Sequence, residues 1–417
     1  MGFIDPLVAV IISFCCLGIM LYKRVNLGIT LNATAIILAL LALSWQEIPT
    51  IVYETSVSLL TISVVLATFG IMWLSQLYKE TGFINKLSES LSRIIKKPKI
   101  VLSVLPAIIG FLPVAGGALM SAPLVESEGD KLGLKTEKKA YVNLWFRHTI
   151  FPVYPLSQVL ILTAALAGTT IPTIILRQIP VVMVMIIVGY IIGFLNTPNP
   201  KIEENPKTSD GLDLNSHLKT FLMTFSPILA TIIAAVSLEL FVGLEFSKLG
   251  FDVLIATFIG IIVLIVISKL SLQTFVKPLK SWGIYGVTLA AYGAFLLGSV
   301  MKAIGISKVF ETIAASGSVD ITVLLTVVPG VLGVLTASAL GGVSISIPIL
   351  SGILALSSKT ASLIYMSSYL GYVIAPTHLC FAFTADYFKC PLGKAYKYLI
   401  PSFLITFATA LLVYFLA

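Results

Sequence analysis

The sequence is poor in charged residues: aspartate, glutamate, lysine and arginine together make up 11% of its 417 residues. Soluble proteins carry about 25% of such residues, and a chain of this length does not make up the difference by enlarging one buried core. Hydrophobic residues make up 58% of the chain, and the mean hydropathy is +1.03. The shortage of charge therefore excludes an ordinary soluble protein and predicts a membrane protein whose apolar surface faces the lipid bilayer.

Residues that carry chemistry are also scarce. The chain has 3 histidines and 4 cysteines, and the cysteines (Cys15, Cys16, Cys380 and Cys390) do not have the spacing of a metal-binding motif. We find no phosphate-binding loop and no pattern of a nucleophile with its base. The sequence therefore predicts no cofactor and no enzymatic activity, and it leaves open whether a metal ion binds.

Long apolar runs are abundant. They are roughly 17–25 residues long, which is the length of membrane-spanning helices and not of the ~10-residue strands of a barrel. We therefore expect an all-α membrane protein with about ten transmembrane helices. The predicted spans are 3–21, 28–44, 57–78, 140–167, 173–195, 218–241, 251–269, 284–301, 360–388 and 394–416. Two further apolar stretches, 101–125 and 320–351, are interrupted by glycine and serine, and we predict that they form re-entrant hairpins.

The net charge of +8 is distributed unevenly. The basic residues lie in loops between apolar runs, which argues against a nucleic-acid partner. If both hairpins enter and leave on one side, most of the 27 lysines and arginines fall on the same side of the membrane. The positive-inside rule then predicts a multi-pass protein of the cell membrane with its N- and C-termini outside.

The two halves of the sequence resemble each other at an offset of 223 to 225 residues. Gly116-Gly117, Ser121 and Pro123 recur as Gly341-Gly342, Ser346 and Pro348. We therefore predict a first repeat over 1–195, a cytoplasmic linker over 196–217 and a second repeat over 218–417. In the predicted topology the repeats have opposite orientations, and inverted repeats with interrupted segments at matching positions are typical of secondary transporters.

Each repeat is expected to contain a hairpin (101–125 and 320–351) followed by a broken helix (140–167 and 360–388). Proline removes a helical hydrogen bond, and unwound backbone at membrane depth is tolerated where it is buried or lines a wet cavity. A helix that begins at such a break directs its N–H groups toward the cavity, which favours an anion. The predicted substrate-binding residues are Gly116, Gly117, Ser121, Arg147, His148, Pro152, Tyr154, Ser338, Gly341, Gly342, Ser344, Pro376, Thr377 and His378.

Arg147 is the one basic residue placed deep in a predicted span, where an ionisable side chain indicates function. Its forked donors match a carboxylate or phosphate. The alternative is a structural role toward carbonyls of a neighbouring helix, or extension toward the inner surface. His148 and His378 can donate to a substrate oxygen or carry a coupling proton, or else they only pack. The serine and threonine residues can likewise act through helix packing alone.

The hairpins with the pattern Gly-Gly-x-x-x-Ser-x-Pro (116–123 and 341–348) and the breaks at Pro152 and Pro376 resemble the ion transporter superfamily. This superfamily includes gluconate permeases, divalent-anion symporters and sodium/proton antiporters. Within it, the chain looks like an uncharacterised prokaryotic family of integral membrane proteins. The resemblance implies a scaffold and a transport domain, often in a homodimer, that move by an elevator-like mechanism. It also implies that substrate binds between the hairpin tips and the breaks.

These observations lead to one main functional hypothesis and two alternatives. The first is a secondary active transporter that takes up a small organic anion, a carboxylate or sugar acid, coupled to H+ or Na+. The second is a cation/proton antiporter of the same fold, which would need buried carboxylates at the breaks. The third is a lipid-phosphate translocase, which would need a groove beside Arg147 that is open to lipid.

Overall fold

A computed structural model describes residues 4–95, 97–111, 117–197, 210–305 and 320–416, and this part of the chain is helical and contains no β-strand. Seven segments are long and apolar enough to cross a membrane. They are α4 (Leu59–Glu80), α8 to α9 (Thr136–Leu166), α10 (Ile171–Phe194), most of α11 (Asp210–Val242), α13 (Phe251–Ser268), α15 (Trp282–Ala303) and α21 (Leu392–Leu416). The predicted class, a helical multi-pass membrane protein, is confirmed.

Three of the ten predicted spans are not among these seven segments. α1 (Pro6–Tyr22) and α2 (Leu27–Ala42) contain 17 and 16 residues, slightly fewer than the ~20 that cross a bilayer without distortion. The third span, 360–388, is divided into α19 (Ser358–Ile374) and α20 (Leu379–Tyr387). Of the predicted linker, residues 198–209 lie outside the described part of the chain, and Asp210–His217 form the first turns of α11.

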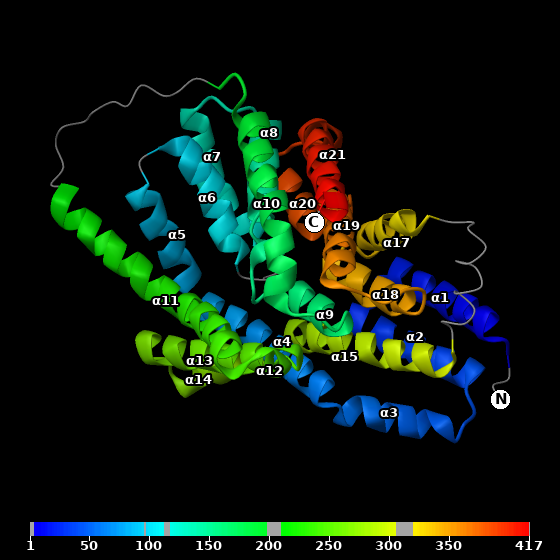
Figure 1. The fold of residues 1–417 in the computed structure, drawn as a ribbon. Helices are drawn as coiled ribbons and strands as arrows, with labels where there is room; N and C mark the ends of the chain where they lie inside the picture. The colour runs from blue at the N-terminus through cyan, green and yellow to red at the C-terminus, as the bar shows by residue number, and fades with distance from the viewer. Residues whose placement is uncertain (1–3, 96, 112–116, 198–209, 306–319, 417) are drawn as a thin grey trace.

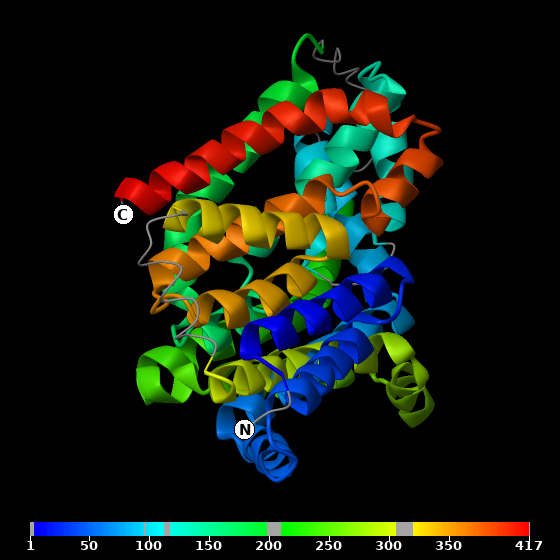
Figure 2. The same ribbon diagram turned by 90° about the vertical axis from the view of Figure 1, so that its right-hand side faces the viewer.

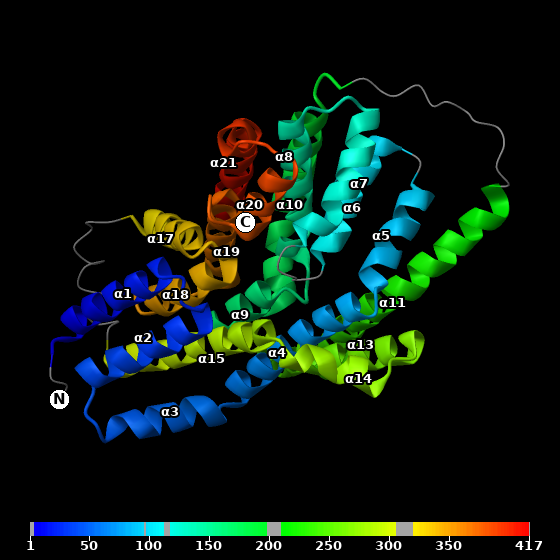
Figure 3. The same cartoon turned by 180° about the vertical axis from the view of Figure 1, so that it is seen from behind.

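The helices form two groups, each of which combines segments from both halves of the chain (Figures 1 and 3). In the first helix group, α2 packs on α15 and α11 packs on α13. Its remaining members are α1, α3 (Glu47–Val57), α4, α5 (Phe83–Ile94), α12 (Leu244–Lys248), α14 (Leu272–Val276) and η2 (Lys277–Lys280).

In the second helix group, α19 packs on α17 (Ile321–Thr336), and α21 packs on α10. The other members are α6 (Pro98–Gly110), α7 (Ala118–Lys131), α8 (Thr136–Arg147), η1 (Phe151–Val153), α9 (Gln158–Leu166), α18 (Ala339–Ser351) and α20. Figure 2 shows the two groups as stacked layers, with α21 at the top and α3 at the bottom. Contacts between α15 and α18, between α4 and α9 and between α5 and α6 join the groups.

Small residues allow α2 and α15 to approach closely. A Cβ atom added at Gly28 would lie 2.5 Å from the Gly286 carbonyl oxygen, and one added at Gly293 would lie 2.8 Å from Leu31 Cβ. Asn32 Nδ2 also donates a hydrogen bond to the Leu289 carbonyl oxygen, at 2.9 Å. Such close backbone contacts are the usual means by which helices associate in lipid, where the hydrophobic effect does not drive association.

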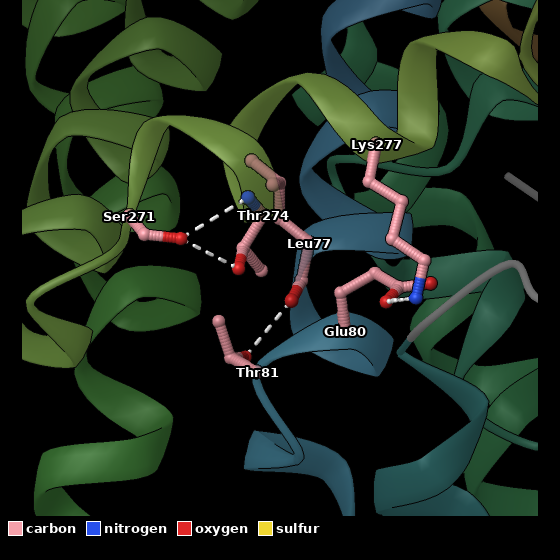
Figure 4. A network of polar contacts seen from close by, with 6 residues as sticks. All are labelled: Leu77, Glu80, Thr81, Ser271, Thr274 and Lys277. Carbon is pink, nitrogen blue, oxygen red and sulfur yellow. Dashed lines mark hydrogen bonds and ion pairs between the residues drawn. The ribbon is translucent and has the colours of Figure 1, made fainter.

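Polar side chains gather at the end of α4 and around α14 and η2 (Figure 4). Lys277 Nζ lies 2.6 Å from Glu80 Oε2, and the Lys277 side chain is 64% exposed. Nearby, Ser271 Oγ accepts a hydrogen bond from the Thr274 amide at 3.2 Å. Because exposed charges of this kind are costly in hydrocarbon, this end of the first helix group marks a boundary between lipid and water.

The close contact of α2 with α15 can be tested by Gly28→Val. The added side chain overlaps Gly286 and Leu289, and overpacking of this kind costs about 1–3 kcal/mol. We expect a lower midpoint of thermal unfolding for the protein in detergent. Gly18→Val on α1 is the matched control, because a Cβ atom there meets no atom within 4 Å. Equal shifts for the two variants would contradict the proposed packing.

Candidate functional site

Two interrupted helices meet inside the second helix group. α8 ends at Arg147, and the chain passes through η1 before α9 begins at Gln158; α19 ends at Ile374, and α20 begins at Leu379. The two breaks touch, because the ring centroids of His148 and His378 are 4.8 Å apart. Residues separated by 230 positions in the sequence therefore form one site.

Tyrosine hydroxyls donate hydrogen bonds to carbonyl groups at the breaks, and one of these carbonyls, that of Phe151, also accepts from the Tyr154 amide at 3.3 Å. Tyr369 donates to the His148 carbonyl oxygen at 2.6 Å, Tyr365 donates to that of Phe151 at 3.2 Å, and Tyr396 donates to that of Ile374 at 2.7 Å. A buried carbonyl without a partner is costly, and these hydrogen bonds remove that cost. The first two also join α19 to the end of α8.

A cavity of about 250 Å³ lies at the meeting of the breaks. Its wall is largely apolar, with a few polar groups, as is usual for sites that bind small molecules. All the lining residues except Val287 of α15 belong to the second helix group. They are Arg147, His148, Phe151, Gln158, Val159, Val287, Ala337, Ser338, Ala339, Leu340, Tyr369, Tyr372, His378, Leu379 and Cys380.

Arg147 brings a buried positive charge to this cavity. Its exposed fraction is 2%, and arginine remains charged even when it is buried. Gly117, at the start of α7, lies against the guanidinium group, so that a Cβ atom added at Gly117 would overlap the Arg147 side chain. The glycine therefore provides the space that the guanidinium group occupies.

Three helices begin at the cavity. Gln158 is the first residue of α9, Ser338 is the N-cap of α18, and His378 is the N-cap of α20. The N-terminus of a helix carries a partial positive charge and N–H groups that are not bonded within the helix. Together with Arg147, these three N-termini give the cavity the electrostatic character of an anion site.

The two histidines differ in their hydrogen bonds. His148 Nδ1 lies 2.7 Å from the Leu144 carbonyl oxygen, and a carbonyl only accepts, so Nδ1 carries the proton in the neutral ring. The lone pair of Nε2 faces the Tyr372 hydroxyl, at 3.4 Å. The ring of His378 lies against that of Tyr372, with centroids 3.9 Å apart and the ring planes tilted by 43°. Within the described residues, neither ring nitrogen of His378 has a hydrogen-bond partner.

A buried polar network lies one helical turn before Arg147 on α8. Ser121 Oγ donates to Asn143 Oδ1 at 2.6 Å, and Asn143 Nδ2 donates to the Ala118 carbonyl oxygen at 3.0 Å and to Thr384 Oγ1 at 3.1 Å. Asn143 lies four residues before Arg147 and thus on the same face of α8. The network joins α7, α8 and α20.

Of the predicted substrate-binding residues, four line the cavity: Arg147, His148, Ser338 and His378. Gly117 packs against the Arg147 guanidinium group, and Gly116 lies outside the described residues. Ser121 faces Asn143 and not the cavity.

The other predicted residues lie away from the cavity wall. Gly341 packs on Thr336 and Gly342 on Ser368, while Ser344 Oγ donates to the Leu340 carbonyl oxygen at 2.6 Å. Pro152 is buried in η1, and the Tyr154 ring packs against that of Phe111, with centroids 4.9 Å apart. Pro376 and Thr377 are exposed. These residues shape the breaks and the hairpin, but they do not line the cavity.

Sequence reasoning missed Asn143, Tyr369, Tyr372 and Cys380. A lone asparagine in an apolar run is one signal that was available, and Cys380 two residues after His378 is another. The structure brings one possible metal-ligand atom each from His148, His378 and Cys380 within 4.8 Å of one another. The linear spacing of the cysteines did not indicate this cluster, because its members come from two distant segments.

The polar network predicts that Asn143→Ala is destabilising. The change leaves Ser121 and Thr384 without their buried partner, and such a loss costs about 1–3 kcal/mol. We expect a lower midpoint of thermal unfolding than for Asn85→Ala, which changes an exposed asparagine of α5. An unchanged midpoint for Asn143→Ala would show that the network adds no stability.

Comparison with known proteins places the chain in a family. No curated protein matches it. A family model described as protein of unknown function (DUF401) matches residues 7–417. Because this match covers nearly the whole chain, the membrane protein described above belongs to the DUF401 family.

Proposed function

We propose that this protein is a secondary active transporter for a small organic anion, a carboxylate or sugar acid, with H+ or Na+ as the coupling ion. The observation that carries the proposal is the cavity between the two helix breaks, where Arg147 and three helix N-termini meet. Broken helices whose N-termini point at a cavity inside the membrane are the usual way in which secondary transporters bind anionic groups.

The charges around the cavity favour an anion over a cation. No aspartate or glutamate is among the lining residues that the structure describes, so the cavity carries the positive charge of Arg147. The described lining residues thus lack the carboxylates that the alternative, a cation/proton antiporter, would need.

The helix lengths support the finer topology of ten spans and two re-entrant hairpins. α6, α7 and α18 contain 13, 14 and 13 residues, fewer than the 16 of α2 and well short of the ~20 of a full span. We propose that α6 with α7, and α17 with α18, each enter and leave on the same side, with both termini outside and the two repeats inverted. This arrangement agrees with the resemblance to the ion transporter superfamily.

The two helix groups support an elevator-like movement. All but one of the cavity-lining residues belong to the second helix group, so this group can carry the bound solute as one body. We propose that the first helix group, held together by the glycine contacts of α2 with α15, is the scaffold along which the second group moves.

The proposal predicts that a small anion stabilises the purified protein. We would measure thermal unfolding with a panel of carboxylates, sugar acids and phosphates at several pH values, with and without sodium. A ligand at 100 times its dissociation constant adds about 2.7 kcal/mol to stability. Uptake of the stabilising anion into proteoliposomes under a proton or sodium gradient then identifies the coupling ion.

Arg147→Ala is the decisive variant. Loss of a charge-assisted hydrogen bond costs about 1.5–3 kcal/mol, so we expect anion affinity to fall by about 10–100-fold. Arg177→Ala is the matched control, because Arg177 lies outside the cavity and donates to Ser358 Oγ at 3.2 Å. Anion binding that survives Arg147→Ala would exclude the proposed site. Stabilisation by cations alone would favour the antiporter, and stabilisation by phospholipids alone would favour the translocase.

A further inference from the structure

The cavity also contains a cluster of metal-binding side chains that anion transport does not explain. We propose that His148, His378 and Cys380 form a transition-metal site with three protein ligands and one position open to the cavity, and that the site binds Zn2+ or Cu+. Nitrogen and sulfur ligands select these soft or borderline ions over Mg2+ and Ca2+. Three protein ligands with an open fourth position are typical of sites whose metal contacts a solute.

The spacing of the three side chains suits a metal ion. One possible ligand atom from each residue lies within 4.8 Å of the others. With bond lengths of about 2.0–2.1 Å to nitrogen and 2.3 Å to sulfur, tetrahedral ligands lie about 3.3–3.6 Å apart. A bound metal ion would therefore draw the three ligand atoms closer together than the 4.8 Å within which they lie.

His148 has the hydrogen bond expected of a metal ligand. Histidines that bind metal usually donate their other ring N–H to a carbonyl or carboxylate, which fixes the tautomer and the ring orientation. His148 Nδ1 donates in this way to the Leu144 carbonyl oxygen at 2.7 Å. In the neutral ring the lone pair of Nε2 faces the Tyr372 hydroxyl at 3.4 Å, and a metal ion would replace this long contact.

His378 supplies an independent argument. Its side chain is 1% exposed, and within the described residues both ring nitrogens are without a hydrogen-bond partner. A buried polar group in this condition is costly, and most such groups in proteins do have a partner. A bound metal ion would satisfy one nitrogen of His378 and thus account for its place in the cavity wall.

Cys380 completes the set and determines its charge. It is a free cysteine, 8% exposed, and a thiol that coordinates a metal loses its proton. With Cu+ the three-ligand site is neutral; with Zn2+ it has a charge of +1. An anion at the fourth position would offset that charge together with Arg147. This last step rests on the proposed anion transport, whereas the three-ligand site does not.

The site can be tested by metal binding to the full-length protein in detergent after treatment with a chelator. We expect one Zn2+ per chain in equilibrium dialysis, and a Co2+ spectrum with bands of a tetrahedral site and of thiolate charge transfer. Cys380→Ser and His378→Gln should each weaken binding by more than the roughly 10–100-fold that follows loss of an outer-shell partner. Cys390→Ser and His217→Gln are the matched controls and should bind as the unmodified protein does.

A second variant tests the same metal site if the single replacements of Cys380 and His378 do not fold. Replacement of Cys15, Cys16 and Cys390 by serine leaves Cys380 as the sole thiol. The thiolate–cobalt band should persist in this variant, and its absence would overturn the proposal. Failure of the unmodified protein to bind Zn2+, Cu+ or Co2+ stoichiometrically would overturn it as well.

The outcomes for the metal site and for the transporter are separable. An anion that stabilises the metal-free protein without any stoichiometric metal binding would overturn the metal site and leave the transport proposal intact. Stoichiometric metal binding that requires Cys380, without stabilisation by any anion, would support the metal site and count against anion transport.

Discussion

The structure depends on how the backbone groups of its unwound segments are hydrogen-bonded within a membrane. Two helices stop and restart inside the second helix group, and each interruption frees carbonyl groups that lipid cannot satisfy. The hydroxyls of Tyr369 and Tyr396 bond to the freed carbonyls of His148 and Ile374, and that of Tyr365 bonds to the Phe151 carbonyl, which also accepts from the Tyr154 amide. Tyr365 and Tyr369 are on α19, which ends at the second break, and their acceptors follow α8, which ends at the first. The same hydrogen bonds therefore serve the backbone of the first break and hold the two breaks together. The cavity exists because the two breaks are joined in this way.

Around this centre, the two helix groups have different kinds of contact. Within the first group, glycines bring α2 and α15 into backbone contact, and a packed interface of this kind resists sliding. Within the second group, the network of Ser121, Asn143 and Thr384 crosses three helices. Fewer elements join the groups to each other, chiefly α15 with α18 and α5 with α6. Each group is therefore more strongly connected internally than it is to its neighbour.

The general architecture could be predicted from the sequence because it follows from local properties. Apolar runs of sufficient length gave the helices, and Pro152 and Pro376 marked the breaks within a few residues. Roles inside the site were harder to predict. Gly341, Gly342 and Ser344 stand beside a hairpin turn, as expected for ligand-binding residues, yet they pack against their own neighbours. Whether a glycine near a turn makes room for a solute or for a side chain depends on which distant helix lies opposite.

The residues that were missed illustrate the same point. Cys380 becomes a potential ligand only because His148, from the other half of the chain, lies beside His378. Tyr372 and Asn143 likewise gain their roles from partners more than 200 residues away. No pattern within one segment contains such information, and a single sequence does not reveal which segments meet.

The position of Val287 has a consequence for energetics. Among the described residues it is the one member of the first helix group that touches the cavity, and its side chain offers neither charge nor hydrogen bond. If the second group slides past it, the polar surroundings of a bound solute remain the same on both faces of the membrane. In a carrier of the proposed kind, such a site would bind its cargo with similar affinity at the two ends of the cycle, and neither end would hold the cargo more tightly than the other.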